Sequence, residues 1–447
     1  MNRLIMEQGS LFGELAHQRY PAAALIDIDI RNLAQAEADT LTAIESGTKT
    51  ILEATFRHGQ LRVLSDVVER LEDGSWHLIE VKSSTSAKAE HIPDLAYQRY
   101  VMEANGYPVS RCSVLHANTA GHWPDIDSYF SEVDVTAAVA SRLSQVATDL
   151  IDLMPLLDEG SPCPDVIFSK VCTKCDLQYH CWQGIEKPTI YDVIDARKIA
   201  AMENDGIFYI DDIPTDYELS ASVRTLVDRM QQKMVDIDKG AVQQLIGGLE
   251  YPLYHLDFES VAIATPLFDD SPPWRKYAVQ YSLHIEQADG GIEHVWFLHQ
   301  DNSDPSEHIA RSLVENVGPT GSLVVYHKTM EKGVLMDLAM RYPQMRAPLE
   351  SMANRIWDLE LVFKTPYRHW QWTTRSTLKK VLPTLVPDLS YQELEIQEGG
   401  SASAQWIAMA RTEDKVEKAA IVEALLRYCE LDTLAMVRLL KLARELS

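Results

Sequence analysis

The stretch of residues 61–82 constrains the fold of this chain most, because it contains two strand-like runs separated by a short acidic turn. The first run contains Asp66, and the second carries Glu80 and Lys82. Side chains of a strand alternate between two faces, so Glu80 and Lys82 share one face while Val81 points into the opposite layer. The pattern predicts an antiparallel hairpin on which an acid and a lysine lie side by side.

Asp66, Glu80 and Lys82 together indicate metal-dependent cleavage of a phosphodiester. Mg²⁺ and Mn²⁺ prefer hard carboxylate oxygens, and a nearby lysine can orient or deprotonate water and offset the charge that builds on phosphorus. An acid-x-Lys pair also occurs in ordinary surface hairpins, where it forms a salt bridge. Glu53 upstream and Gln98 on an expected helix at 93–106 favour the active-site interpretation.

The order of these residues resembles the RecB-like branch of the PD-(D/E)xK nuclease superfamily, over roughly residues 9–182. The resemblance implies a restriction-endonuclease-like mixed sheet in which Asp66 and Glu80 bind metal and Lys82 serves catalysis. It also implies that Gln98 and Tyr100 support the site or contact DNA.

The first helix of these nucleases usually brings a histidine or an acid to the metal. Residues 13–17 of this chain offer both Glu14 and His17. We take Glu14 as the expected ligand, with His17 as the alternative.

Four of the six cysteines fall within one short stretch with the spacing C-x8-C-x2-C-x5-C, namely Cys163, Cys172, Cys175 and Cys181. The start of the chain lacks the long apolar segment of a secretory signal peptide, so we expect a cytoplasmic location, where thiols stay reduced. The spacing therefore predicts metal or cluster binding rather than disulfides. Four thiolates suit either Zn²⁺ or a four-iron cluster, so spacing does not choose between them.

The RecB-like resemblance favours an iron–sulfur cluster (4Fe-4S) over Zn²⁺, because relatives with C-x2-C-x5-C after the catalytic core commonly carry one. Their remote N-terminal cysteine is absent here, since no cysteine precedes Cys112. Cys163 is then the expected fourth ligand, with His180 as the alternative if the metal is zinc. Cys112 lies in an apolar run and is expected to be a buried core thiol.

A second acidic pattern lies in the C-terminal half of the chain. Asp257 and Glu259 alternate on a strand-like run at 254–259 and therefore share one face. Tyr428 and Asp432 are four residues apart on an expected helix, which places them on one helical face. Each pair alone also occurs on ordinary strand edges or helix surfaces, but their presence in this order indicates a metal site.

This second pattern resembles the DEDD exonucleases, whose RNase H-like fold places Asp-x-Glu on its first strand, an Asp at a strand-to-helix junction, and a last Asp preceded by Tyr or His. The spacing Tyr-x3-Asp marks the tyrosine subclass. The resemblance implies two divalent ions, Mg²⁺ or Mn²⁺, with Tyr428 orienting the attacking water. The strand-to-helix junction is expected after the run 323–327. Glu331 lies there in place of the family's Asp, and Asp358 is the alternative acid. The implied metal ligands are Asp257, Glu259, Glu331 and Asp432.

Basic and aromatic side chains are interleaved between residues 364 and 383. Aromatic stacking and phosphate contacts would suit a single-stranded nucleic-acid end. Arg375, Lys379 and Lys380 are the expected nucleic-acid-binding residues. The alternative is that Trp370 and Trp372 belong to the core and that the lysines form a solvated helix face.

Length and composition predict two domains, because 447 residues with 46% apolar content can bury two cores, and the two resemblances imply that both domains are α/β. We expect a RecB-like domain at 1–183, a helical bridge at 184–249 and a DEDD-type domain at 250–447. No run reaches the roughly 18 apolar residues of a membrane span, so no membrane partner is expected. The net charge of −25 argues against tight nonspecific duplex binding, so local basic grooves and metals must attract nucleic acid.

The motifs together predict a metal-dependent nuclease with two active sites, whose C-terminal site trims 3′ ends and whose N-terminal site cuts or trims DNA, in repair or antiviral defence. The order of the two halves is similar to an uncharacterised bacterial two-nuclease family, on the phrases at 80–85 and 428–437. DNA ends or duplex are the expected substrates, and RNA is an alternative because nothing here reads a 2′-hydroxyl. The rival interpretation is a nucleic-acid-binding scaffold with one or both sites inactive. The motifs do not specify a protein partner such as a helicase.

Overall fold

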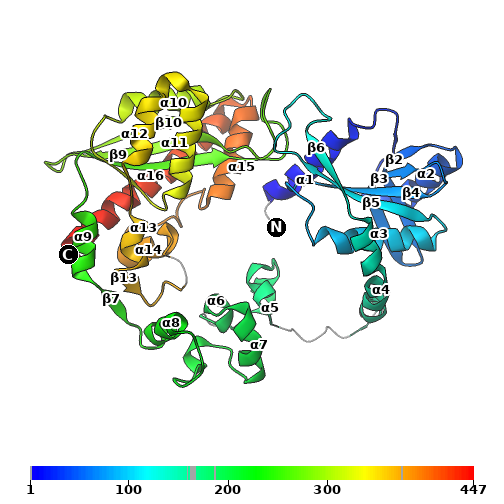
Figure 1. Ribbon diagram of the computed structural model, residues 1–447, viewed down its shortest axis with the longest axis horizontal. Coiled ribbons are helices and arrows are strands. Elements are labelled where there is room, and N and C mark those ends of the chain that lie inside the picture. Colours follow the sequence, from blue (N-terminus) through cyan, green and yellow to red (C-terminus); the bar gives the residue numbers. More distant parts are fainter. Residues whose placement is uncertain (1–2, 159, 162–167, 186–187, 374–375, 447) are drawn as a thin grey trace. The chain divides into compact units, whose positions relative to one another are not determined.

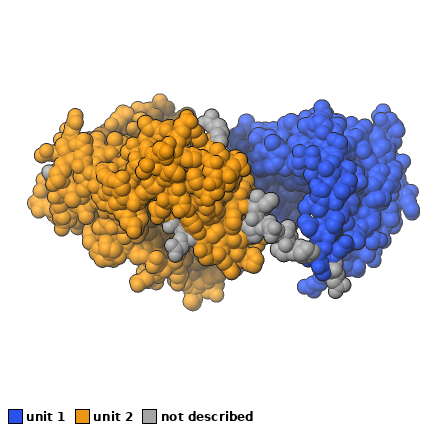
Figure 2. All heavy atoms as spheres, turned by 90° about the horizontal axis from the view of Figure 1, so that it is seen from below, with its two compact units in different colours: residues 1–165, 262–276 blue, residues 166–261, 277–447 orange. Residues whose placement is uncertain are grey.

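The computed structural model describes residues 3–158, 160–161, 168–185, 188–373 and 376–446 (Figure 1). The chain divides into two compact units, coloured separately in Figure 2. Unit 1 contains residues 1–165 and 262–276, and unit 2 contains residues 166–261 and 277–447. Both contain sheets and helices, so the predicted α/β class is confirmed. The division at 183 and 249 that the sequence suggests stays a prediction.

Unit 1 is built on a six-stranded mixed sheet with the order β1-β2-β3-β4-β5-β6. The β1–β2 and β4–β5 pairs are parallel and the other neighbours antiparallel. The predicted hairpin is β3 and β4, and its turn includes Gly74 at a φ of 82°. The strands are β1 (Ala24–Leu25), β2 (Thr50–His58), β3 (Leu61–Arg70), β4 (Trp76–Lys82), β5 (Val109–Ala117) and β6 (Phe130–Asp134).

Helices cover both faces of this sheet. One face packs in an apolar core with α2, α3 and α4, and the other packs with α1 and with residues from 262–276. Strand alternation assigns Leu78 to the first core and Ile79 to the second. The helices are α1 (Arg3–His17), α2 (Leu33–Glu45), α3 (His91–Ala104) and α4 (Thr136–Leu153), with short 3₁₀ helices η1 (Ile30–Asn32) and η2 (Met154–Leu157).

Unit 2 contains a five-stranded sheet with the order β10-β9-β8-β11-β12. The three strands β10, β9 and β8 are antiparallel, whereas β8, β11 and β12 run parallel. A separate two-stranded sheet pairs β7 with β13. The strands are β7 (Val235–Ile237), β8 (Leu253–Val261), β9 (Tyr277–Glu286), β10 (Ile292–Leu298), β11 (Ser322–Val325), β12 (Ile356–Asp358) and β13 (Tyr367–His369).

The main sheet of unit 2 also lies between two helical layers. One face packs against α10 (Ser306–Asn316), α11 (Thr329–Arg341) and α12 (Arg346–Asn354), the group drawn in yellow in Figure 1. The long helix α16 (Lys415–Leu446) crosses the other face. The remaining helices near this sheet are α13 (Glu360–Lys364), α14 (Leu378–Leu385) and α15 (Gly399–Arg411), with the 3₁₀ helix η5 (Pro343–Met345). Within the described ranges, no helix is both long and apolar enough to pass through a membrane.

The segment expected as a helical bridge is mostly helical, but residues 220–246 do not form one continuous helix. They form α8 (Ala221–Gln231), then β7, then α9 (Lys239–Ile246). Lys233 has a φ of 52°, which ends the helical path, and β7 pairs with β13 instead. Asp238 then starts α9 by accepting a hydrogen bond from the backbone N–H of Ala241. The other elements are η3 (Lys170–Lys174), α5 (Gln178–Cys181), α6 (Ile190–Val193), α7 (Ala196–Asn204) and η4 (Ile210–Asp212).

Gly321 precedes β11 and should not tolerate a side chain. Its φ is 90°, and an added Cβ would lie 2.1 Å from the carbonyl oxygen of Pro252. We expect Gly321→Ala to lower the free energy of unfolding of unit 2 by at least about 1–3 kcal/mol. Gly333→Ala in α11 is the matched control, because nothing lies within 4 Å of its added Cβ. Denaturant unfolding measures both, and equal stability of the two variants would contradict the prediction.

A buried ion pair should make unit 2 sensitive to acid. Burial acts to raise the pKa of Glu286, but hydrogen bonds from His255 and Arg444 outweigh it and lower the pKa to about 2. Burial lowers the pKa of His255. In the unfolded chain both groups take up protons at higher pH, near their ordinary pKa values of about 4.3 and 6.5. Stability should therefore fall as the pH is lowered from about 7 towards about 3.

The variant Glu286→Gln removes the contribution of this carboxylate to the pH dependence of stability. We expect the variant to lose about 1–3 kcal/mol of stability at neutral pH and to show a shallower further loss below about pH 5. Glu293→Gln, on the exposed surface of β10, is the control and should keep the wild-type profile. Thermal unfolding across this pH range is the measurement, and parallel curves for wild type and Glu286→Gln would rule out the linkage.

Candidate metal centres and nucleic-acid site

The acids of the C-terminal pattern meet on the face of the unit 2 sheet that α16 covers. On β8, Tyr254, Leu256 and Phe258 pack into the core beneath α10–α12. Alternation therefore directs Asp257 and Glu259 to the opposite face. The helix α16 brings Tyr428 and Asp432 to the same place, because residues four apart share a helical face.

Asp257, Glu259 and Asp432 form a group in which one carboxylate oxygen of each residue lies within 4.8 Å of the other two. Burial, and then the charges of Asp432 and Glu259, raise the pKa of Asp257 well above its usual range. Burial and the charge of Asp432 raise the pKa of Glu259 to about 8. The pKa of Asp432 is raised to about 6 by burial, against the lowering effects of Tyr391 and Lys379. Three desolvated carboxylates at this spacing form a favourable site for a divalent cation.

Glu331 lies in the first turn of α11, directly after β11, and its side chain is buried. Its charge raises the pKa values of Asp257 and Glu259, so it lies near the acidic group. Asp358, the alternative acid, instead accepts hydrogen bonds from the backbone N–H groups of His327, Lys328 and Glu360. These three bonds hold Asp358 at the start of the two helices.

A lysine and two tyrosines surround the acidic group. Lys379 donates hydrogen bonds to the hydroxyl of Tyr428 (2.9 Å) and the carbonyl of Gln397 (2.6 Å). Tyr391 donates a hydrogen bond of 2.5 Å to Asp432. Burial, and then Asp432 and Glu259, raise the pKa of Tyr428 far above its usual value. The Tyr428 phenol therefore stays neutral and can orient a ligand through its hydroxyl, but it cannot serve as a phenolate base near pH 7.

A cavity of about 1050 Å³ within unit 2 is lined by Asp257, Glu259, Glu331, Tyr428 and Asp432. Arg368, His369, Trp372 and Lys379 of the basic and aromatic stretch also line it. Trp372 is 5% exposed and packs in the core at the same time. Trp372 therefore belongs to the core, as the alternative interpretation expects, and nucleic-acid binding by this stretch stays a prediction.

The other two basic residues of the stretch differ in what the structure shows. Lys380 is exposed and donates a hydrogen bond to Thr373 at 3.1 Å. Arg375 lies outside the described residues.

The N-terminal acids meet in unit 1 on the sheet face that α3 covers. The β3–β4 ladder runs from Arg70–Trp76 to Val67–Ile79. Just beyond it, Asp66 accepts a hydrogen bond of 2.6 Å from the backbone N–H of Val81. Burial raises the pKa of Asp66 to about 7, and burial together with Asp66 raises the pKa of Glu80 to about 8.

Lys82 bridges two acids of this site. Its Nζ lies 2.6 Å from Oε1 of Glu80 and 3.0 Å from Oδ2 of Asp94. Burial acts to lower the pKa of Lys82, but the two carboxylates outweigh it and raise the pKa. Gln98 donates a hydrogen bond of 2.6 Å to Glu80, and its own Oε1 is buried without a hydrogen-bond donor among the described residues. That free acceptor is a group a cation or its bound water could use.

On the first helix, α1, His17 contacts Glu53 of β2: its Nε2 lies 3.1 Å from Oε1 of Glu53. Glu53 has a φ of 56°, interrupts the β2–β3 ladder, and raises the pKa of Asp66 by its charge. Glu14, the preferred residue from sequence, is exposed. The buried stripe of α1 is centred on Phe12, and two residues at about 100° each place Glu14 on the opposite side.

Some of the other residues expected from sequence lie in or beside apolar cores, and others are exposed or outside the described residues. Tyr100 is half-buried and packs against the core of unit 1. Cys112 is buried in β5, as expected. Cys172 and Cys181 pack beside a small core around Trp182, and Cys175 is exposed. Cys163 lies outside the described residues, so the four-cysteine ligand set, with iron or zinc, stays a prediction.

Two residues that contact the candidate sites, Asp94 and Tyr391, were not found from sequence, and neither was the pairing of His17 with Glu53. Asp94 precedes Gln98 by four residues on α3, and this spacing was a usable signal. Tyr391 lies in a loop without periodicity, and its distance from Asp432 in the chain leaves no signal in a single sequence.

Comparisons with known proteins give little further information. The family described as "Domain of unknown function (DUF2779)" matches residues 254–376, which include β8 and the junction before α11. No curated protein matches. A solved structure described as "Crystal structure of SSO0001" matches with 17% identity and a TM-score of 0.17, covering 41% of this chain and 82% of that one. The central part of unit 2 is therefore similar to a family whose function is not established.

Proposed function

We propose that this protein is a metal-dependent nuclease that hydrolyses phosphodiester bonds, with a 3′–5′ exonuclease site in unit 2 and a RecB-like site in unit 1. The observation that carries the proposal is the group of the half-buried Asp257 and Glu259 and the buried Asp432, which lies beside Lys379 and a cavity. The location of Asp-x-Glu on β8 and of an acid after β11 agrees with the DEDD resemblance.

The acids of unit 2 fit a hard divalent cation. Their oxygens are close together, and burial disfavours three negative charges without a counter-charge. Asp257, Glu259 and Asp432 would hold Mg²⁺ or Mn²⁺, with Glu331 close by. When bound, such an ion supplies Lewis acidity and lowers the pKa of coordinated water.

The remaining groups position the substrate. Lys379, fixed by Gln397 and by the rings of Tyr391 and Tyr428, places a positive charge at the cavity where a phosphate would lie. Tyr428 would orient water through its neutral hydroxyl, and Tyr391 holds the Asp432 carboxylate in position. Arg368, His369 and Trp372 extend the lining with groups suited to a phosphate and a base.

The site of unit 1 supports a second nuclease centre. Asp66 and Glu80 would hold the cation, with the Glu53–His17 pair close by. Lys82 has a raised pKa in the absence of metal, so it acts there as a cation that can stabilise charge on phosphorus. Gln98 and Asp94 fix Glu80 and Lys82 through hydrogen bonds.

Cleavage of end-labelled DNA with Mn²⁺ tests the proposal. Asp257→Asn should remove 3′ trimming, and Lys82→Ala should remove the remaining products. Each loss should exceed about 100-fold, because even outer groups of a metal site cost about 10–100-fold. Glu293→Gln and Lys88→Ala alter exposed residues and should leave cleavage unchanged.

The same assay separates the alternatives. Cleavage of RNA but not of DNA of the same sequence would replace the proposed substrate with RNA. A wild-type protein that binds nucleic acid and never cuts it, in single-stranded or duplex form, would favour the scaffold interpretation. If Asp257→Asn retains full 3′ trimming, the unit 2 acids are not the exonuclease site.

Lys379 should contribute to binding of a single-stranded end. We expect Lys379→Met to weaken binding of a single strand. A plot of the logarithm of the binding constant against the logarithm of the salt concentration should become less steep by roughly 0.7, the contribution of one phosphate contact. Lys415→Met, at the exposed start of α16, is the matched control. Binding titrations with catalytically inactive Asp257→Asn protein at several salt concentrations measure the slope. An identical slope with and without Lys379 would exclude a phosphate contact at this position.

A further inference from the structure

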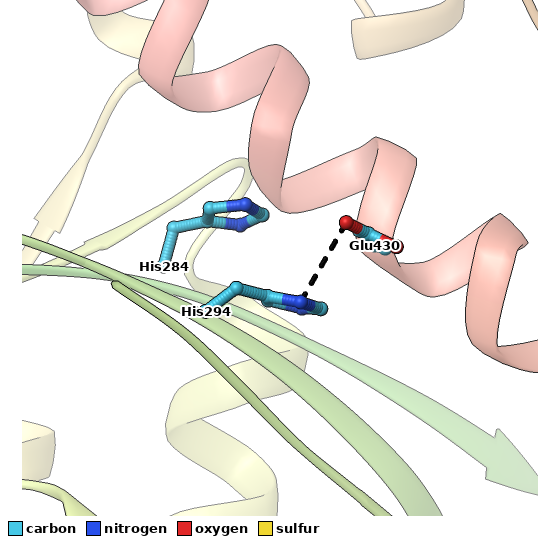
Figure 3. A group of neighbouring side chains, drawn as sticks. All are labelled: His284, His294 and Glu430. Carbon is cyan, nitrogen blue, oxygen red and sulfur yellow. Dashed lines mark ion pairs between the residues drawn. The ribbon is translucent and has the colours of Figure 1, made fainter. Parts of the chain in front are cut away.

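A second group of metal-binding side chains lies on the other side of α16, at β9 and β10. It consists of His284, His294 and Glu430, shown in Figure 3. His284 and His294 face each other across the β9–β10 pair, and their rings stack with centroids 4.4 Å apart. One ligand atom from each of the three residues lies within 4.8 Å of the others. Glu430 is two residues before Asp432, about 200° around the helix, so it points away from the acidic group.

Hydroxyl groups hold one nitrogen of each histidine ring. The Nδ1 of His284 lies 2.8 Å from the hydroxyl of Thr433, and the Nε2 of His294 lies 2.9 Å from the hydroxyl of Ser282. Ser282 and Thr433 bond to each other at 2.6 Å, and Thr433 donates to the carbonyl of Glu430 at 3.1 Å. With this chain of donors, each held nitrogen can carry a proton and donate it to a hydroxyl.

The opposite nitrogens are then left with lone pairs. Nδ1 of His294 faces Oε1 of Glu430 at 3.6 Å, the dashed line in Figure 3. Nε2 of His284 has no hydrogen-bond partner among the described residues, although the residue is only 5% exposed. Two nitrogen lone pairs and a carboxylate therefore belong to one group of neighbouring side chains, and no proton donor among the described residues is shown between them. A metal ion satisfies all three, and histidine ligands in proteins are commonly held through their other nitrogen in this way.

We propose that His284, His294 and Glu430 bind a zinc ion that fixes α16 to the β9–β10 pair. Two imidazoles and one carboxylate favour Zn²⁺ over Mg²⁺, which prefers oxygen ligands. Neighbouring ligand atoms around tetrahedral zinc lie roughly 3.3 Å apart, so zinc binding would draw the three ligand atoms closer than in the present arrangement and turn at least one of the stacked rings. Glu430 has a side chain that is 46% exposed and is free to move, and water can complete the coordination. This site does not depend on the proposed nuclease activity.

Metal content of the full-length protein tests the site. After chelation and dialysis against Zn²⁺, wild type should retain one more equivalent per chain than His294→Gln or Glu430→Gln. Comparing variants in this way cancels zinc bound by the cysteines or by the unit 2 acids. His308→Gln is the matched control, because His308 also stacks on a histidine, His299, in the same unit and is exposed. It should retain the wild-type content.

The Co²⁺ spectrum supplies an independent readout. Subtracting the Co²⁺ spectrum of His294→Gln from that of wild type should leave weak visible d–d absorption. The intense near-ultraviolet band of thiolate ligands should be absent from this difference spectrum. Zn²⁺ should also raise the melting temperature of metal-depleted wild type more than that of Glu430→Gln. Because Glu430 is partly exposed, its variant should fold even if a histidine variant does not.

Equal metal content and identical Co²⁺ spectra in wild type and both variants would overturn the proposal and leave His294 and Glu430 as an ion pair only. Asp257→Asn should keep this zinc equivalent. Loss of cleavage with retention of zinc, or the reverse, therefore distinguishes a failure of the nuclease proposal from a failure of this one.

Discussion

The packing of α16 on a polar strand face is the interaction on which the rest of unit 2 depends. Alternate residues of β8 and β9 send their apolar side chains to the core under α10–α12, so their polar partners lie beneath α16. That helix covers acids, histidines and hydroxyls that would otherwise be solvated. Burial of charged groups is costly unless they are paired or bind a cation, and the arrangement therefore favours metal binding on both sides of the helix.

Both candidate sites bring carboxylates close together, but the lysine beside them makes different contacts in the two sites. In unit 1, Lys82 contacts Glu80 directly and partly neutralises it. In unit 2, Lys379 contacts the tyrosine hydroxyl, and no described hydrogen bond joins it to an acid. Burial raises the pKa values of the acids at both sites, so the two sites differ in the direct contact of a lysine with an acid, which the described residues show only in unit 1. This difference makes the unit 2 group the stronger candidate for a bound divalent cation.

The net charge of −25 is compatible with a nucleic-acid substrate only if attraction is local. The cavity of unit 2 provides such a place, because Arg368 and Lys379 lie on its wall beside the acids. A cation bound by those acids would add to the same local attraction. A substrate end would then be drawn to the cavity while the rest of the surface repels duplex, which suits an enzyme that acts on ends.

Local periodicity by itself determined the alternation of strands and helices, the hairpin at 61–82, the shared face of Asp257 with Glu259 and the shared face of Tyr428 with Asp432, because strands and helices repeat within a few residues. The break at Lys233, the contact of His17 with Glu53 and the contact of Tyr391 with Asp432 were decided only by the tertiary structure. These depend on strand pairing and helix packing between residues distant in the chain. The convergence of histidines from β9 and β10 with α16 has the same cause, since no spacing in one sequence encodes which face a distant helix will cover.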